Sequence, residues 1–216
     1  RSIVAKLPAD LKPELSLAVM DVCGAPALTA RVVRSYVDKG TKPVVSVIGG
    51  AGKSGSLSLA AARSAGLDYL LGENLACHRE PSTIAGLETL LTDGDAAHAP
   101  VRLCLDVGHQ CVPGTTGPDR DPYAWLTHFG GRLAEVQLQQ SDGLADHHWP
   151  FTAERNQAGR IDPGRVLDTL AEAGAQDVLL VLEVIPAFEQ DDAGALADLR
   201  ASAELWQAAL TERGAR

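Results

Sequence analysis

The chain has 216 residues, of which 45% are hydrophobic and 22% are charged, and its formal net charge is −9. These values suit one compact domain or slightly more, and they exclude an intrinsically disordered chain, a collagen-like repeat and a small disulfide-stabilised scaffold. The acidic balance argues against general nucleic-acid binding, and no run of 18 apolar residues exists that could span a membrane. Four cysteines at irregular spacing, with no CxxC pair and no secretory leader at the start, predict reduced thiols and a cytoplasmic location.

Charge and residue types divide the chain into two parts. Residues 1–67 hold every lysine and a net charge of +5, whereas residues 68–216 hold every histidine and a net charge of −14. This shift predicts two regions of different sequence origin that meet between residues 67 and 68. The alternative is a chance distribution combined with a histidine-rich functional half.

The first expected elements are mainly helical. The segment Pro13–Val37 has helical character that Gly24 and Pro26 interrupt. A short β-branched run, Val44–Ile48, then predicts a strand, and an Ala- and Leu-rich stretch predicts a helix that continues to about Ala65.

From residue 68 onward, expected strands and helices alternate, with a long polar loop between residues 140 and 161. The expected strands are Asp68–Leu75, Val101–Val107, Leu133–Gln139 and Val178–Ile185. The expected helices are Ser82–Leu91 (with Ser82 as its cap), Pro122–Phe129, Pro163–Ala173 and Ala193–Arg213. This alternation predicts an α/β fold with a parallel sheet of about five or six strands.

A glycine-rich turn follows the first expected strand. Gly50, Gly52 and Gly55 form the pattern G-x-G-x-x-G, in which glycines allow the backbone to approach a pyrophosphate at a helix N-terminus. A P-loop is excluded because its leading glycine position holds Val47. The pattern is compatible with a dinucleotide or phosphate site and equally with a tight strand-to-helix turn.

The region around this turn resembles one family. The string Met20–Ala27 together with Val44–Gly66 is similar to part of L-erythro-3,5-diaminohexanoate dehydrogenase, over about residues 8–67. The resemblance implies a Rossmann-like βα unit and NAD(P) as a cofactor at Gly50, Gly52 and Gly55. Because only one nucleotide-binding βα turn is recognisable, we expect NAD(P) to bind weakly or not at all.

Polar side chains end four successive strands in the second part of the chain. Glu73, Asp106, Gln139 and Glu183 each lie near the C-terminal end of an apolar strand, where α/β proteins form their active sites. One such acid alone is usually a strand-end cap or a salt-bridge partner. Three carboxylates and an amide together favour a hard divalent ion such as Mn or Mg.

The motifs around these residues resemble a second family. Glu73-Asn74-Leu75-Ala76, Cys104–His109, Gln137–Asp142 and Leu182–Pro186 are similar to the xylose isomerase-like sugar and sugar-phosphate isomerases and epimerases, over about residues 69–212. In that family a Glu, an Asp, a His or Gln, and a second Glu bind one divalent metal.

The resemblance implies a site and a reaction for this chain. The implied metal ligands are Glu73, Asp106, Gln139 and Glu183; Gln137 replaces the His of a family His-x-Gln motif, so the ligand is either Gln137 or Gln139. His109 matches a family position that contacts the substrate. Glu73 and Glu183 are the expected acid and base for proton transfer through an enediolate, with His109 beside them.

The long polar loop offers further substrate-binding candidates. His147, His148 and Arg155 surround aromatic residues in this segment, and Arg155 is suited to pairing with a substrate phosphate. The alternative is a surface loop with solvated histidines.

The chain is short for a complete member of the isomerase family. Only about 70 residues precede Glu73, where an eight-stranded TIM barrel would need four more βα units. The expected architecture is therefore a half-barrel of four βα units, residues 68–216, preceded by a dehydrogenase-like fragment, residues 1–67. Three hypotheses follow: a metal-dependent isomerase or epimerase, an NAD(P)-dependent dehydrogenase-like protein, and a non-catalytic chimera. A homodimer could cover the open edge of such a sheet.

Overall fold

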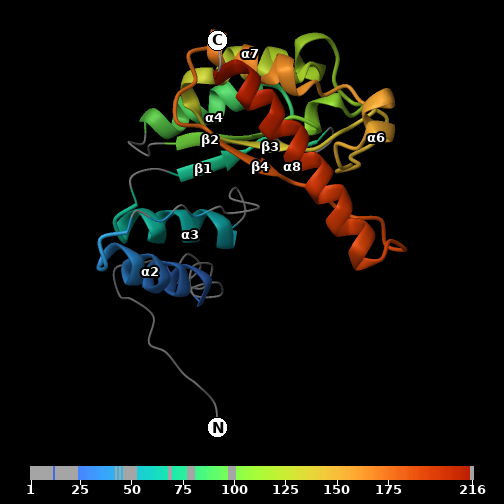
Figure 1. The fold of residues 1–216 in the computed structure, drawn as a ribbon. Helices are drawn as coiled ribbons and strands as arrows, with labels where there is room; N and C mark the ends of the chain where they lie inside the picture. Colours follow the sequence, from blue (N-terminus) through green and yellow to red (C-terminus); the bar gives the residue numbers. More distant parts are fainter. Residues whose placement is uncertain are drawn as a thin grey trace. The chain divides into compact units, whose positions relative to one another are not determined.

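The computed structural model describes residues 12, 24–41, 43, 45, 53–67, 70–76, 81–96 and 101–214 (Figure 1). The chain forms two compact units, Arg1–Gly72 and Glu73–Arg216. The boundary predicted between residues 67 and 68 lies a few residues before this division.

The described part of the first unit contains helices α2 (Gly24–Val37) and α3 (Lys53–Ser64). A small apolar cluster that includes Val33 and Ala62 joins them. The helix expected after the glycine-rich turn is thus present as α3.

One expectation for this unit, the interrupted helix, needs correction, and another, the strand with its glycine-rich turn, stays open. Gly24 and Pro26 lie in the first turn of α2 rather than interrupting a helix, because proline is compatible with a first turn, where its missing N–H is not needed. Gly55 lies within α3. Gly50, Gly52 and most of the expected strand lie outside the described residues.

The described residues form one sheet in the order β1-β2-β3-β4, of which β2, β3 and β4 lie wholly in the second unit and β1 ends there at Glu73. The strands are β1 (Leu70–Glu73), β2 (Val101–Asp106), β3 (Leu133–Leu138) and β4 (Leu179–Leu182). Strand β3 pairs in parallel with β2 and with β4. The predicted parallel α/β fold is confirmed, with four strands among the described residues instead of the five or six expected.

Helices connect these strands. They are α4 (Ile84–Ala96), α5 (Pro122–Phe129), α6 (Ala153–Ala158), α7 (Pro163–Glu172) and α8 (Asp192–Gly214), with 3-10 turns η1 (His109–Cys111), η2 (Gly117–Arg120) and η3 (Gly130–Arg132). The sequence missed α6, a short helix whose N-cap Thr152 accepts a hydrogen bond from the Arg155 N–H. The helix expected from Ser82 begins at Ile84, and the capping hydroxyl is that of Thr83, which accepts from the Gly86 N–H at 3.1 Å.

Helices α4, α5, α7 and α8 pack their apolar sides on one face of the sheet, as Figure 1 shows for α4, α7 and α8. Leu103 and Leu105 of β2 and Val136 and Leu138 of β3 lie in this core, together with Trp206 of α8. No helix in the described part of the chain combines the length and the apolar character needed to cross a membrane.

The register of the strands places polar residues at one level on the other face. Asp106 of β2 is opposite Gln137 of β3, and Gln137 is opposite Val181 of β4, so that Glu183 follows directly beyond. The parallel strands therefore deliver their polar ends to the same edge of the sheet.

Candidate active site

Glu73, Gln137 and Glu183 meet at the C-terminal ends of three strands. The amide of Gln137 lies between the two carboxylates, with one terminal atom 3.3 Å from Glu73 Oε1 and 3.1 Å from Glu183 Oε2. In one orientation the amide nitrogen donates to both carboxylates. In the other orientation the amide oxygen faces them, and this arrangement needs either a cation among the oxygen atoms or a proton on one of the carboxyl groups.

Asp106 lies beside this cluster and is fully buried. Its Oδ1 accepts hydrogen bonds from the Gly108 N–H at 2.7 Å and from the His109 N–H at 3.0 Å, where η1 begins. These bonds fix the carboxylate at the end of β2, as expected for an aspartate that caps a turn.

Asn74 connects the ends of β1 and β2 and was missed as a site residue by the sequence analysis. Its side chain accepts from the Asp106 N–H at 2.7 Å and donates to the Asp106 carbonyl at 3.1 Å and to Gln110 Oε1 at 2.8 Å. The Asn74 carbonyl is 3.0 Å from His109 Nδ1. The only signal in the sequence was its place directly after Glu73.

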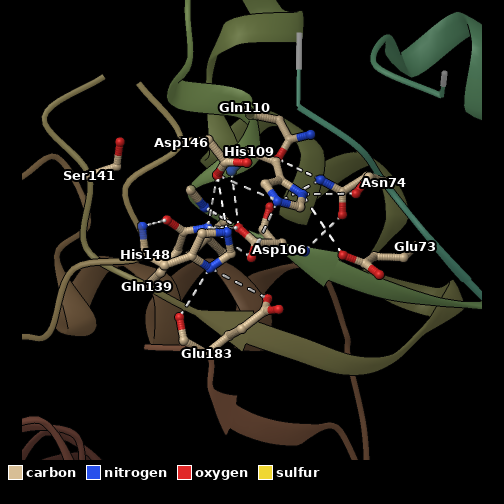
Figure 2. A network of polar contacts seen from close by, with 12 residues as sticks. Glu73, Asn74, Asp106, His109, Gln110, Gln139, Ser141, Asp146, His148 and Glu183 are labelled. Carbon is tan, nitrogen blue, oxygen red and sulfur yellow. Dashed lines mark hydrogen bonds and ion pairs between the residues drawn. The ribbon is translucent and has the colours of Figure 1, made fainter. Parts of the chain in front are cut away.

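The imidazole rings of His109 and His148 lie edge to face, with centroids 5.7 Å apart, close to Asp106 and Asp146 (Figure 2). His109 Nδ1 faces the Asn74 carbonyl, and His148 Nδ1 is 3.2 Å from the Glu183 carbonyl. Because a carbonyl only accepts, both Nδ1 atoms carry a proton, and the Nε2 atoms are directed to Asp146 Oδ1, at 3.6 Å from His109 and 3.2 Å from His148.

The ionisation of these groups reflects their crowding. Burial, followed by a hydrogen bond with Asp106, raises the pKa of Glu183 to about 8, and burial also raises the pKa of Glu73. The hydrogen bond with His148 lowers the pKa of Asp146 to about 2. Burial opposes the charged form of His148, but the hydrogen bond with Asp146 and the charge of Asp106 outweigh it and raise the pKa of this imidazole to about 9. The site therefore contains a His148–Asp146 ion pair beside an oxygen-rich cluster.

Gln139, predicted as a metal ligand, lies between Asp106 and His148. Its amide nitrogen is 3.0 Å from both oxygens of Asp106, and its amide oxygen accepts from the His148 N–H at 2.8 Å. The amide oxygen keeps a second lone pair, so the ligand role of Gln139 stays a prediction. Of the two glutamines left open by the sequence, Gln137 is the one that lies between Glu73 and Glu183.

A second set of cation donors overlaps the first. Asp106, His109 and His148 each offer one ligand atom, and these atoms lie within 4.8 Å of one another. The ion pair between His148 and Asp146 competes with this use of the His148 ring.

His147 and Arg155, predicted to bind substrate with His148, lie in a separate cluster. The ring of His147 stacks on Trp149 with ring centroids 4.1 Å apart, and the guanidinium of Arg155 lies 4.2 Å from the centroid of the Trp149 ring. They line a cavity of about 600 Å³, together with residues that directly follow Glu183. His147 therefore faces this cavity, while the neighbouring His148 faces the carboxylates.

No family model matches the chain. It is 36% identical over 127 residues to the D-erythrulose 1-phosphate 3-epimerase of Brucella abortus, a match that covers 57% of this chain and 41% of that protein. It is also 46% identical over 55 residues to the L-erythro-3,5-diaminohexanoate dehydrogenase of Acetoanaerobium sticklandii, which covers 26% of this chain and 14% of that enzyme. The chain thus spans less than half of either relative.

The solved structures that resemble this chain also include isomerase- and epimerase-type proteins. A protein from Rhodospirillum rubrum, described as a candidate xylose isomerase, superposes with a TM-score of 0.64 at 26% identity and covers 83% of this chain and 66% of its own. The 3-keto-D-glucoside 4-epimerase YcjR from E. coli superposes with a TM-score of 0.51 at 14% identity, covering 83% of this chain and 69% of its own, which is a likeness of fold alone. The predicted resemblances are confirmed: the chain carries a partial parallel α/β fold of the xylose isomerase-like type and is similar to a sugar-phosphate epimerase, with a short segment similar to the dehydrogenase.

Proposed function

We propose that the chain provides the metal site and the proton-transfer groups of a sugar-phosphate isomerase or epimerase. The observation that carries this proposal is the meeting of Glu73, Asp106, Gln137 and Glu183 at the ends of four neighbouring parallel strands. The similarity to an erythrulose-phosphate epimerase supports it.

The donor set fits a hard divalent ion. Three carboxylates and one amide oxygen are the ligands that Mg²⁺ and Mn²⁺ prefer. With metal–oxygen bonds of about 2.1 Å, neighbouring ligand oxygens around such an ion lie about 3 Å apart. The Gln137 amide lies 3.3 Å from Glu73 Oε1 and 3.1 Å from Glu183 Oε2, so its oxygen would reach an ion held by these carboxylates if the amide turned toward it. We therefore assign the ligand role to Gln137 rather than to Gln139.

The protein groups around this centre are suited to moving a proton on and off a carbon. A bound divalent ion would stabilise the negative charge that develops on a substrate oxygen. Glu73 and Glu183 approach the Gln137 amide from two different strands, so one can remove the proton next to a carbonyl while the other returns it.

The cavity beside His147 and Arg155 is our candidate for the substrate phosphate. In the described part of the chain no carboxylate pairs with Arg155, whose contact is the Trp149 ring. Two acids that line the cavity, Glu154 and Glu189, are exposed to solvent, and a third, Asp198, accepts a hydrogen bond from Gln190 at 2.7 Å. The guanidinium is therefore available to a phosphate monoester, the group that the related epimerase's substrate carries.

The test is a proton-exchange measurement on the purified chain with Mn²⁺ and D-erythrulose 1-phosphate in D₂O. We expect deuterium to appear at the carbon next to the carbonyl, detected by NMR, and to be lost on addition of a chelator. The variants Glu73→Gln and Glu183→Gln should each abolish exchange, whereas Glu172→Gln, an exposed residue on α7, should not. Absence of exchange in a folded protein that binds Mn²⁺ would limit the chain to metal binding, and exchange that survives the chelator would contradict metal dependence.

A homodimer that covers the open edge of the sheet stays a prediction. Measuring the molar mass of the protein in solution tests it.

The short likeness to a dehydrogenase supports a second candidate, NAD(P) binding at Gly50, Gly52 and Gly55. We expect weak or no dinucleotide binding by this segment, because one βα turn lacks the second half of such a site. Equilibrium dialysis with NAD and NADP tests this expectation. Micromolar binding that is lost in Gly52→Val would favour the dehydrogenase alternative.

A further inference from the structure

Gln139 is buried completely and uses both ends of its amide inside the site. The nitrogen is 3.0 Å from each oxygen of Asp106, and the oxygen accepts from the backbone N–H of His148 at 2.8 Å. The amide cannot turn over without placing its oxygen against the carboxylate and its nitrogen against an N–H. Its orientation is therefore set by both partners at once.

One of these partners has an uncommon backbone conformation. His148 has φ = 50°, in the left-handed region that side chains other than glycine rarely adopt. Besides the bond that its N–H donates to Gln139, its carbonyl accepts from the Ile185 N–H at 3.0 Å, and its Nδ1 is 3.2 Å from the Glu183 carbonyl. Strained residues held by several partners are typical of functional sites.

Gly108, two residues after Asp106, leaves room for the Gln139 side chain. A Cβ atom at Gly108 would lie 2.3 Å from Gln139 Cδ, closer than any side chain allows, although the backbone of Gly108 is not in the left-handed region. The Gly108 N–H also donates to Asp106 Oδ1 at 2.7 Å. The turn after β2 and the end of β3 are thus built around the Gln139 amide (Figure 2).

From these contacts we infer that Gln139 is a positioning residue that sets the plane of the Asp106 carboxylate and the backbone of His148. This inference rests on the proposed function, in which Asp106 is a metal ligand. Partners that orient ligating carboxylates typically change metal affinity 10- to 100-fold when they are removed.

The neighbouring residue, Gln140, is a matched control. It is also buried, it bonds to Ile161 N and O at 2.9 Å and to Asn156 Oδ1 at 2.9 Å, and a Cβ at Gly159 would lie 2.1 Å from its Cδ. Gln140 is therefore also held by several buried hydrogen bonds, but it makes them with α6 and the loop before α7 and not with the carboxylates.

The experiment compares Gln139→Met, Gln139→Glu and Gln140→Met by titration calorimetry with Mn²⁺ and by NMR of the histidine rings in the metal-free protein. We expect both Gln139 variants to bind Mn²⁺ 10- to 100-fold more weakly and to shift the ring signals of His148. Gln140→Met should lose comparable thermal stability while it keeps the Mn²⁺ affinity within about threefold of the original protein.

Several outcomes would overturn the inference. Undiminished Mn²⁺ affinity in Gln139→Glu would make residue 139 a ligand, because a carboxylate replaces an amide ligand but cannot donate to Asp106. If Gln140→Met lost as much Mn²⁺ affinity as the Gln139 variants, the weaker binding would reflect a general loss of stability and not a positioning role of Gln139. The ring signals give an independent test: if the original protein binds no Mn²⁺, the proposed function fails, while unmoved His148 signals in either folded Gln139 variant overturn the positioning role itself.

Discussion

The two faces of strands β2 and β3 differ sharply although both are buried. On one face Leu105 and Val136 are inaccessible to solvent and pack under the helices. On the other face Cys104 contacts Glu135 at 3.4 Å, and burial raises the pKa of this thiol well above its usual range. The apolar face stabilises the fold by its burial alone, whereas buried carboxylates cost free energy until a positive charge joins them.

This contrast makes the two faces respond differently to a divalent ion. Substitutions on the apolar face should change the free energy of unfolding by the same amount with and without Mn²⁺. Substitutions among the carboxylates should matter mainly when the ion is present, because like charges already repel one another in the metal-free protein. The predictions below test this difference.

The largest expected effect is that of Leu105→Ala on the apolar face. Removal of this side chain leaves a cavity under the helices and should lower the free energy of unfolding by about 2–5 kcal/mol. Denaturant titration with and without Mn²⁺ measures this loss, which should be the same in both conditions. Leu144→Ala, at a position that is 72% exposed, is the control and should change stability little. A loss at Leu105 that depended on Mn²⁺ would show that the two faces do not act separately.

The next largest effect is expected for Glu183→Gln on the polar face. At 100 times its Kd, Mn²⁺ should stabilise the original protein by about 2.7 kcal/mol, and the variant should lose most of this gain. In the absence of metal the variant should be as stable as the original protein or more so, because one half-buried carboxyl group that repels its acidic neighbours is removed. Thermal melts with Mn²⁺ and with chelator measure both quantities. A variant destabilised equally in both conditions would assign Glu183 to folding and not to metal binding.

The sequence predicted most of the second unit because its signals are local. The alternation of apolar residues located β2 and β3, and α5 begins at Pro122 and ends at Phe129 as predicted. Strand ends are less local, since β4 is limited to Leu179–Leu182 by its pairing with β3 and not by its own apolar run. Helix α6 was missed because its sequence is polar, and its Thr152 cap was hidden in a long loop.

The site was predicted in outline and not in detail. Glu73, Asp106 and Glu183 could be placed together because parallel strands end at a common edge. The choice between Gln137 and Gln139 could not be made, since both follow the same alternation and only the path of the chain after β3 separates them. Asn74 was missed as a partner of His109 because that contact joins segments that are distant in sequence. Asp146 is only two residues from His148, but no regular element in this loop predicts where its side chain points.

The smallest expected effect lies beyond the polar face, at Arg155. If its guanidinium receives a phosphate, Arg155→Met should weaken the binding of inorganic phosphate by about tenfold, or about 1.4 kcal/mol, as the loss of one hydrogen bond between charged groups predicts. Mn²⁺ stabilisation should not change, because Arg155 contacts Trp149 and none of the carboxylate cluster. Arg165→Met is a close control: that guanidinium also lies over an aromatic ring, 3.6 Å from the centroid of Tyr123, but away from this cavity. Phosphate titrations followed by NMR measure both variants. Equal weakening in the two would mean that phosphate responds only to net charge, and the cavity beside Glu183 would then have no part in binding it.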